Sequence, residues 1–210
     1  MVLILFSVLL AFWIEARWQA AQDDDRQDAY LEGVAEDLTR IRGLLEGSLA
    51  RGESWDRASD SLLVTARTTS LPDSTLSELL WRATSLGRAS ATSVALSGLV
   101  ASTAWAELEN LELRDRFAAL ELSLRDLDSS RSTQSDYWFH QLDPYLRYRL
   151  DYAAWEQQGS VPIGGWPALL EDQAFRNMLT HARWIRSGDG GATRRVLERV
   201  DEVLAALIDG

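Results

Sequence analysis

Residues 28–50 read DAYLEGVAEDLTRIRGLLEGSLA, and this stretch decides the fold class. Its large apolar side chains recur at steps of three and four, at Tyr30, Leu31, Val34, Leu38, Ile41, Leu44, Leu45 and Leu49. That spacing gathers them on one face of an α-helix. Comparable spacing returns along the chain, and no alternating strand pattern extends beyond a few residues. The sequence therefore predicts an all-α protein.

Further helices are expected over residues 54–68, 75–81, 92–100, 105–128, 133–158, 168–186 and 193–208. The clearest is 105–128, with an apolar stripe at Leu108, Leu111, Phe117, Leu120, Leu124 and Leu127. The third carries Leu76, Leu79, Leu80 and Trp81, and Thr75 with Glu78 has the spacing of a capping box. Breaks are expected at Arg51-Gly52, 71–74, Gly98, 159–167 and 187–191, and a kink near Leu142-Asp143 because Pro144 follows.

The first fourteen residues, MVLILFSVLLAFWI, contain Ser7 as their one polar side chain. A helix extended to Trp18 reaches about 27 Å, close to the roughly 30 Å hydrocarbon core of a bilayer. A secretory signal peptide lacks support because no basic segment precedes the run, and a buried core helix is the other alternative. We expect a membrane anchor that contacts lipid through Leu3, Leu5, Phe6, Leu9, Leu10, Phe12, Trp13 and Trp18.

The predicted organisation is a membrane anchor over 1–18, a juxtamembrane amphipathic helix over 19–50 and a helical domain over 51–210. No basic residue precedes the span, and Arg17 and Arg26 follow it, which by the positive-inside rule favours a cytoplasmic domain. The acidic, tryptophan-rich character of the domain favours the other side. We expect a single-pass protein of the bacterial inner membrane with an extracytoplasmic domain.

Composition excludes several classes of function. The formal net charge of −11 argues against nucleic-acid binding, which needs a basic surface. The chain contains no cysteine, which removes disulfides, thiol catalysis and thiolate zinc sites. Partners are thus expected to be the lipid bilayer and other membrane protein subunits.

Motifs that carry chemistry are sparse. His140 and His181 lie far apart in the sequence without metal-ligand spacing. Asp23, Asp24 and Asp25 lack the glycine and the terminal glutamate of a calcium loop, so we interpret them as solvated charges. The stretch 188–195, GDGGATRR, resembles a phosphate loop but lacks its lysine and preceding strand, and a turn capped by Thr193 explains it better. No enzyme, cofactor or metal site is predicted.

Aromatic residues crowd into one segment. Trp138, Tyr145, Tyr148, Tyr152 and Trp155 recur at three- or four-residue steps, or multiples of these, and are expected to share a helix face. A core seam is the ordinary interpretation of such a stripe. Tyrosine and tryptophan also dominate binding hot spots, so we expect these rings to divide between core and partner contacts. Rings lying at lipid headgroups are a further alternative.

Several short patches resemble a family of bacterial membrane-anchored helical proteins whose function is unknown. Trp13, Glu15 and Arg17 match the juncture that ends its membrane span, and residues 36–38 match its amphipathic helix. The patches 95–98, 111–114 and 171–177 are similar to later helices of that family. The resemblance implies an anchor and a helical domain, and it implies no catalytic residue.

The expected function is a non-enzymatic accessory or scaffold subunit that packs against and stabilises a larger bacterial membrane complex, with respiratory and photosynthetic complexes as plausible hosts. The alternative is an extracytoplasmic sensor or small-ligand-binding module. Its ligand would enter at the 159–167 loop, between Trp155 and Trp166.

Overall fold

A computed structural model describes residues 2–65, 71–86, 91–102, 104–108, 110–151 and 162–209. Of residues 2–26, 65, 104, 107 and 209 it describes the backbone alone. Helices account for the regular structure of these ranges, and none of the described residues forms a strand. The all-α prediction is confirmed.

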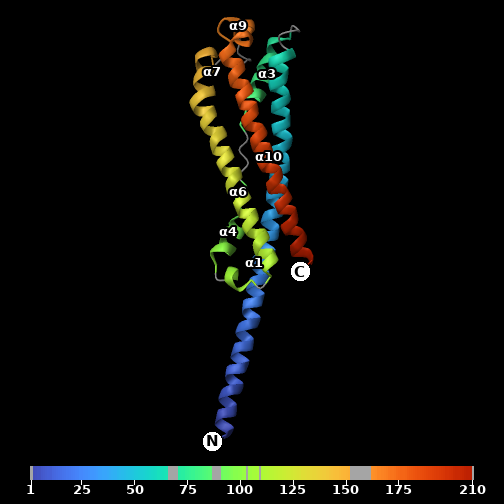
Figure 1. Cartoon of the computed structure of the whole chain (residues 1–210), viewed down its shortest axis with the longest axis vertical. Coiled ribbons are helices and arrows are strands. Elements are labelled where there is room, and N and C mark those ends of the chain that lie inside the picture. The colour runs from blue at the N-terminus through green and yellow to red at the C-terminus, as the bar shows by residue number, and fades with distance from the viewer. Residues whose placement is uncertain are drawn as a thin grey trace. The chain divides into compact units, whose positions relative to one another are not determined.

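Figure 1 shows the helices coloured from the N-terminus to the C-terminus of the chain. Helix α1 (Val2–Asp60) ends in a π-helical turn, η1 (Ser61–Thr65), and the elements that follow before the middle of the chain are α3 (Asp73–Thr84), α4 (Val94–Ala101) and α5 (Ala104–Glu107). The second half holds α6 (Leu111–Tyr137), the π-helical η2 (Trp138–Leu142), α7 (Asp143–Arg149), α9 (Gly165–Glu171) and α10 (Gln173–Asp209).

The predicted anchor lies in the first turns of α1. Its side chains, at Leu3, Leu5, Phe6, Leu9, Leu10, Phe12, Trp13 and Trp18, lie outside the described residues. Among the side chains that the structure does describe, no helix combines the length and apolarity needed to cross a bilayer. The backbone of α1 continues unbroken from the predicted anchor through the predicted juxtamembrane helix and ends at Asp60.

The chain divides into two compact units. Unit 1 comprises residues 1–42, 92–121 and 199–210, and unit 2 comprises residues 43–91 and 122–198. Helices α1, α6 and α10 each contribute residues to both units, so the boundary does not coincide with the predicted division at residue 51.

Buried and partly buried residues of the three long helices recur at alternating steps of four and three. In α1 and the following η1 the series is Val34, Leu38, Ile41, Leu45, Ser48, Gly52, Trp55, Ser59 and Leu62; in α6 it is Leu113, Phe117, Leu120, Leu124, Leu127, Arg131 and Gln134; in α10 it is Phe175, Leu179, Ala182, Arg186, Asp189, Thr193, Val196, Val200 and Val203. This 3.5-residue repeat keeps one seam of each helix turned toward its neighbours, as in coiled coils. The series contains polar residues only within unit 2.

Unit 1 joins α1 to α4 through a carboxylate. Asp37 Oδ2 accepts hydrogen bonds from the Ser93 hydroxyl and the Ala95 N–H, both at 3.1 Å. The bond from Ala95, helped by Arg40, lowers the pKa of Asp37. A Cβ on Gly33 would lie 4.0 Å from that of Ala95, an ordinary van der Waals contact, so the two helices lie close together at this point. Two patches of the family resemblance, 36–38 and 95–98, meet at this contact.

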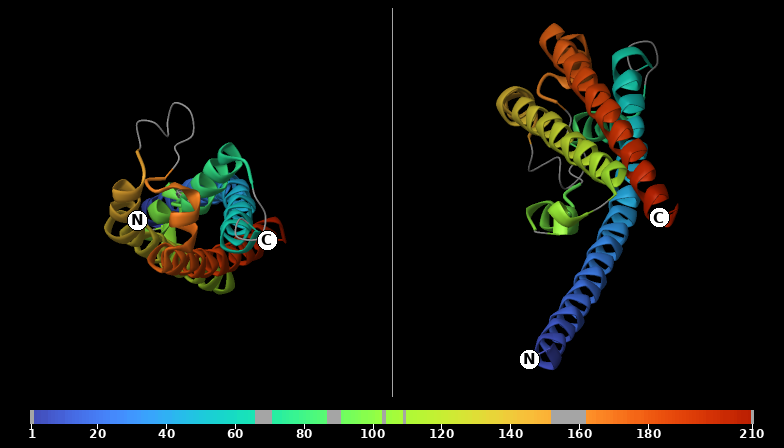
Figure 2. Two further views of the ribbon diagram at one scale, coloured as in Figure 1. Left: turned by 90° about the horizontal axis from the view of Figure 1, so that it is seen from above. Right: turned by 60° about the horizontal axis from the view of Figure 1, so that its bottom comes forward.

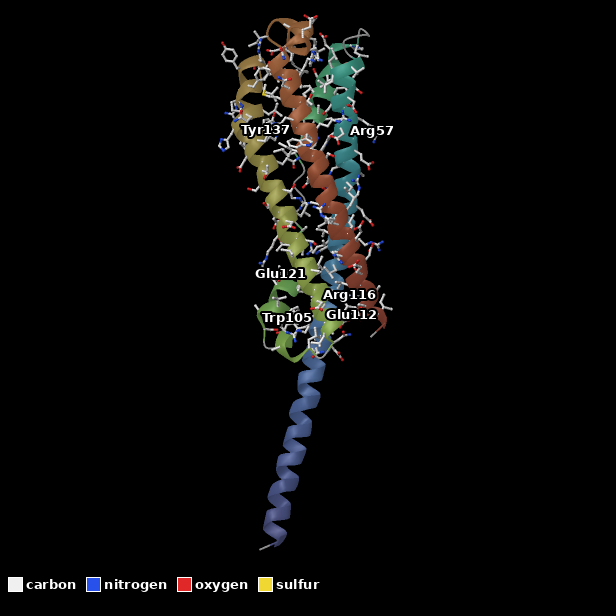
Figure 3. All side chains as sticks on the ribbon, viewed as in Figure 1. Arg57, Trp105, Glu112, Arg116, Glu121 and Tyr137 are labelled. Carbon is white, nitrogen blue, oxygen red and sulfur yellow. The ribbon has the colours of Figure 1, made fainter. Side chains whose placement is uncertain are left out.

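Unit 1 also joins α6 to the end of α10. Arg116 donates to the backbone oxygen of Glu202 at 2.8 Å and pairs with Glu112 on its own helix (Figure 3). Trp105 packs against buried Phe117, and the Arg114 guanidinium lies 5.6 Å from the Trp105 ring centroid. These contacts place the short α5 over the apolar seam of α6.

Two predicted breaks are absent. Helix α1 passes through Arg51-Gly52, and α10 runs as one ribbon through 187–191 (Figure 2). Glycine costs a helix interior about 1 kcal/mol, but buried contacts on both sides of each glycine segment hold the helical conformation. Helical stability in proteins comes mainly from such packing rather than from propensity. Thr193 therefore lies inside α10 and caps nothing.

Other predicted boundaries shift for similar reasons. Helix α6 continues past Thr133. Gly98 lies within α4, which begins after the N-cap Ser93, whose hydroxyl accepts from the Leu96 N–H, and ends at Ala101. Helix α3 begins at Asp73, so Thr75 is an interior residue rather than a cap. The expected helix over 133–158 gives way to extended backbone at Leu150, after α7 has ended at Arg149.

The irregularity expected before Pro144 takes the form of the π-helical turn η2. Proline has no N–H and its ring collides with the carbonyl four residues earlier, which prevents ordinary α-helical bonding there. The chain responds with the wider η2 turn, in which the Asp143 N–H donates to the Trp138 oxygen. Pro144 then occupies the first turn of α7, where its missing N–H costs nothing.

We expect Gly188→Ala to stabilise the protein by about 1 kcal/mol, because alanine is the better helix former. Gly188 is exposed within α10, and a Cβ there would meet nothing within 4 Å. A thermal melt should rise by about 2–4 °C. Gly164→Ala is the matched control and should destabilise, since its φ of +84° disfavours any side chain. An unchanged or lower melting temperature for Gly188→Ala would contradict the continuous α10.

Candidate functional site

An apolar core fills the end of unit 2 formed by η1, α3, α7 and α9. Its buried members include Leu62, Leu80, Leu142, Leu146, Trp166, Leu169, Phe175 and Leu179. Trp166 is only 4% exposed within it. Trp166 was predicted to lie at the entrance of a ligand site, and this prediction is wrong because Trp166 packs as a core residue. Trp155, the other residue predicted there, lies outside the described residues.

Next to this core lies a set of buried and partly buried polar side chains that we call the polar layer: Ser48, Asp56 and Ser59 of α1, Arg131 and Gln134 of α6, and Arg186, Asp189 and Thr193 of α10. Most of them occupy the four-three series described above. Charged and amide groups in such seams are unusual, because burial strips them of water. The polar layer is the candidate functional site.

Arg186 joins α10 to α1 and α3. Its Nε donates to Asp56 Oδ1 at 3.0 Å, its Nη2 to the Ser59 hydroxyl at 2.7 Å and its Nη1 to the Ala83 carbonyl at 2.9 Å. Its side chain is 4% exposed. Burial lowers the pKa of Arg186, and the hydrogen bond to Asp56 opposes that effect. The guanidinium is thus a well-satisfied structural clamp.

Arg131 and Asp189 form a looser pair between α6 and α10. Nε and Oδ1 are 3.7 Å apart, which is an ion pair beyond hydrogen-bond distance, and the two side chains are 11% and 14% exposed. Burial raises the pKa of Asp189 and lowers the pKa of Arg131, and the partner charge opposes both effects. For both side chains the loss of hydration therefore shifts the pKa more than the attraction of the partner charge does.

A cavity of about 90 Å³ opens beside the polar layer, lined by Ser48, Leu49, Gly52, Glu53, Trp55, Asp56, Gln134, Arg186, Ser187, Asp189, Gly190, Thr193 and Arg194. Thr193 is 1% exposed, and its hydroxyl has no hydrogen-bond partner among the described residues. The Oδ1 atom of Asp189 likewise accepts no hydrogen bond there. Buried polar atoms normally have partners, so these two indicate a site for a solute or for water.

The sequence analysis missed the polar layer, although a signal for it exists. Continuing the four-three series from Leu127 reaches Arg131 and Gln134, and continuing it from Ala182 reaches Arg186, Asp189 and Thr193. The predicted turn at 187–191 and the predicted helix start at Thr133 interrupted both series. Because these residues favour turns and helix ends locally, the polar layer could not be recognised as part of two continuous helices.

A second polar cluster surrounds Asp172, between α9 and α10. Its Oδ1 accepts from the Ala174 N–H at 2.8 Å, and its Oδ2 accepts from the Tyr145 hydroxyl at 2.7 Å and from Arg149. The Tyr145 bond lowers the pKa of Asp172. Burial, with that same bond, raises the pKa of Tyr145 to about 12. Asp172 thus caps α10 and holds α7 against it.

Asp172→Ala should cost about 2 kcal/mol at neutral pH, because it removes a helix cap and the acceptor of two side chains. The folded pKa of Asp172 is lowered, so the carboxylate stabilises the protein above its unfolded pKa of about 4. That contribution fades as the pH falls through the folded value. Urea titrations should show the gap between wild type and variant narrowing in acid. A difference in the free energy of unfolding that does not change with pH would contradict the lowered pKa of Asp172.

Comparison of the chain with known protein families, with curated proteins and with solved structures gives no match in any of the three. The resemblance to the membrane-anchored family accordingly stays a prediction.

The structure separates the five predicted interface residues. Trp138 and Tyr145 are half-buried against the apolar core of unit 2, whereas Tyr148 on α7 is 82% exposed. Tyr152 and Trp155 lie outside the described residues. Tyr145 and Tyr148 lie three residues apart on α7, but their surroundings differ. Tyr145 stacks on Phe175 and donates to Asp172, whereas Tyr148 faces solvent.

Two exposed tryptophans were not predicted as contact residues. Trp184 on α10 is 73% exposed, and Trp81 on α3, which we had placed on an apolar stripe, is 64% exposed. Trp184 stacks on His181, whose ring packs edge-on against Tyr137 at 4.6 Å. The sequence does indicate that Trp184 is exposed, because residue 184 does not belong to the four-three series of α10.

The described residues contain no candidate metal site, because no three His, Cys, Asp or Glu side chains lie close enough together to hold a metal ion. His140 and His181 are both exposed. The chemistry that the described part of the chain offers is therefore hydrogen bonding and ion pairing in the polar layer, together with aromatic contact at the surface.

Proposed function

We propose that this protein is a non-enzymatic, membrane-anchored accessory subunit whose helical domain binds and stabilises other membrane protein subunits of a bacterial complex. Respiratory and photosynthetic complexes are the hosts we favour. The observation that carries the proposal is the exposure of large rings: Tyr148 and Trp184 face solvent, whereas Trp166 of the same unit is buried.

Exposed rings of this size suit a binding surface. Tryptophan and tyrosine combine a large apolar area with few rotatable bonds, and they dominate the energetics of interfaces. Trp184 is held by its stack on His181, with ring centroids 5.7 Å apart. A ring that is already positioned loses less conformational entropy on binding.

Tyr148→Ala and Trp184→Ala test the proposal. Membranes are solubilised in mild detergent, and the assembly containing the tagged chain is followed on native gels and by pull-down. At least one variant should weaken association by about 2 kcal/mol, or roughly 30-fold in Kd, with an unchanged thermal melt. Leu122→Ala removes a 62% exposed leucine from α6 as the control. Migration of wild type as a lone chain would contradict the proposal.

Anchoring is tested separately. Deleting residues 1–18 should release the remaining chain from membranes in an alkaline carbonate wash, because the apolar run supplies the attachment. Protease accessibility of intact spheroplasts should then report the side on which the domain lies, for which we propose the extracytoplasmic face of the inner membrane. A truncated chain that stays with the membrane would show that the attachment lies elsewhere.

The second candidate function is a small-ligand-binding module, and the cavity beside the polar layer favours it. Its location differs from the mouth predicted at 159–167. This function is compatible with the first, because the cavity and the exposed rings use different residues.

A further inference from the structure

Helix α10 has a second face in unit 2, opposite its buried seam, that we call the outer stripe: His181, Trp184, Gly188, Gly191, Arg195 and Glu198. Each of these residues follows a residue of the buried four-three series by two positions, which is about 200° of rotation around an α-helix. The outer stripe therefore points away from the core. Five of its residues are exposed, Trp184 at 73%, and Gly191 is partly exposed.

The side chains of the outer stripe are arranged so that each half complements the other half in reverse order. At its two ends lie His181 and Glu198, an imidazole and a carboxylate that can share a hydrogen bond. Inside them lie Trp184 and Arg195, and a guanidinium is attracted to the face of a tryptophan ring. The two glycines occupy the middle, where the absence of side chains allows another helix to approach closely.

These correspondences become contacts when two copies of α10 pack antiparallel. A two-fold axis beside the middle of the outer stripe brings each residue opposite its counterpart, and every contact then occurs twice. A parallel pair would instead place Arg195 opposite Arg195 and Glu198 opposite Glu198, where like charges repel. The charges of the outer stripe therefore favour the antiparallel arrangement.

Two more exposed arginines lie beside the outer stripe, and neither opposes this pairing. Arg183 forms an ion pair with Asp60 of α1. Arg194 borders the outer stripe on the same edge as Ser187. Antiparallel packing brings this edge of one copy against the same edge of the other, so Arg194 lies near Ser187 of the second copy rather than near another arginine.

We propose that the outer stripe of α10 binds a second copy of this chain in an antiparallel, two-fold symmetric pair. Trp184 of each copy packs against Arg195 of the other. The inference rests on the proposed function, in which Trp184 is a contact ring, and it names the partner of that ring. Tyr148 lies on α7 and stays available to other subunits.

Disulfide formation tests the arrangement, because the chain contains no cysteine of its own. Two full-length chains with different tags carry His181→Cys and Glu198→Cys, and they are purified together in mild detergent and oxidised. Detergent is used because a shared bilayer restricts how two copies approach each other. We expect disulfides between the two tags. Equal residues lie about 25 Å apart along an antiparallel pair, so disulfides only between identical variants, or none at all, would overturn the proposal.

Gly188→Leu tests the close approach of the two helices. A Cβ at Gly188 meets nothing within 4 Å, so the fold accepts leucine, but the pairing of two tagged chains should weaken at least tenfold. Gly43→Leu is the matched control, because Gly43 is an exposed glycine of α1 with equally open surroundings, and it should pair fully. Alanine is small enough for close helix packing, so the rise expected for Gly188→Ala stands. Undiminished pairing of Gly188→Leu would overturn the proposal.

A charge exchange tests the ends of the outer stripe. His181→Glu should weaken pairing, because it faces Glu198 of the second copy, and adding Glu198→Arg should restore it. A double variant that pairs no better than the single one would overturn the proposal. Pairing of the purified chain is measured without other subunits, so its loss leaves the native-gel test of the scaffold function untouched. A chain that pairs only with itself would refute the scaffold function and support this inference.

Discussion

Arg186→Met is expected to lower the free energy of unfolding by about 3 kcal/mol, the low end of the range for breaking a buried ion pair. Methionine keeps much of the length and removes every donor. Asp56 and the Ala83 carbonyl then lose the donors that Arg186 gave them, and the Ser59 hydroxyl keeps only the bond that it donates to the Trp55 carbonyl. The low end applies because Asp56 is 31% exposed and can recover some hydration.

Arg183→Met provides the matched control on the same helix. Arg183 pairs with Asp60, but both side chains are 48% exposed. Exposed pairs contribute about 0–1 kcal/mol, since water and salt screen them. Urea denaturation of both variants should therefore separate them by about 2 kcal/mol. Equal losses would mean that Arg186 is not buried as the structure has it.

Replacing Arg131 and Asp189 together by leucine should stabilise the protein by about 1–4 kcal/mol, whereas each single replacement should destabilise it by about 3–5 kcal/mol. The two positions continue the apolar series of α6 and α10, so leucine restores a regular seam. Leucine at 131 alone leaves the Asp189 carboxylate buried without this counter-charge, and leucine at 189 alone removes the first of the carboxylates that oppose the desolvation of Arg131. The double variant removes both desolvation costs at once.

The stability differences among wild type, the two single variants and the double variant should depend on pH because of Asp189. Its folded pKa is raised, so the native state takes up a proton before the unfolded state does. The wild-type pair therefore becomes less costly as the pH falls from neutrality through the folded pKa toward the unfolded value near 4. The advantage of the double leucine variant should shrink over that window. Chemical denaturation at several pH values measures it, and a growing advantage in acid would contradict the burial of Asp189.

A stabilised double variant raises the question of what the charged pair contributes. Polar residues in helical seams can specify register and partner at a cost in stability.

Spacing along the chain was sufficient to predict the fold class, because three- and four-residue steps can be satisfied only by helices. The irregularity before Pro144 was predictable for the same kind of reason, since the missing N–H and the ring act on the residues next to them. Turn residues misled the prediction at Gly52 and over 187–191. Glycine lowers helix propensity locally, and only the neighbouring helices show that packing compensates for it.

The site needed the tertiary structure. The sequence shows that Arg131, Arg186 and Asp189 are charged, but it does not show which elements surround them. Whether a charge is solvated or buried depends on helices distant in the chain, here α1 and α3 around Arg186 and α6 beside Asp189. The same holds for the rings: Trp166 is buried and Trp184 exposed because of where other helices lie. Periodicity is a property of one segment and can be read from it, whereas burial belongs to several segments at once and is decided by their packing.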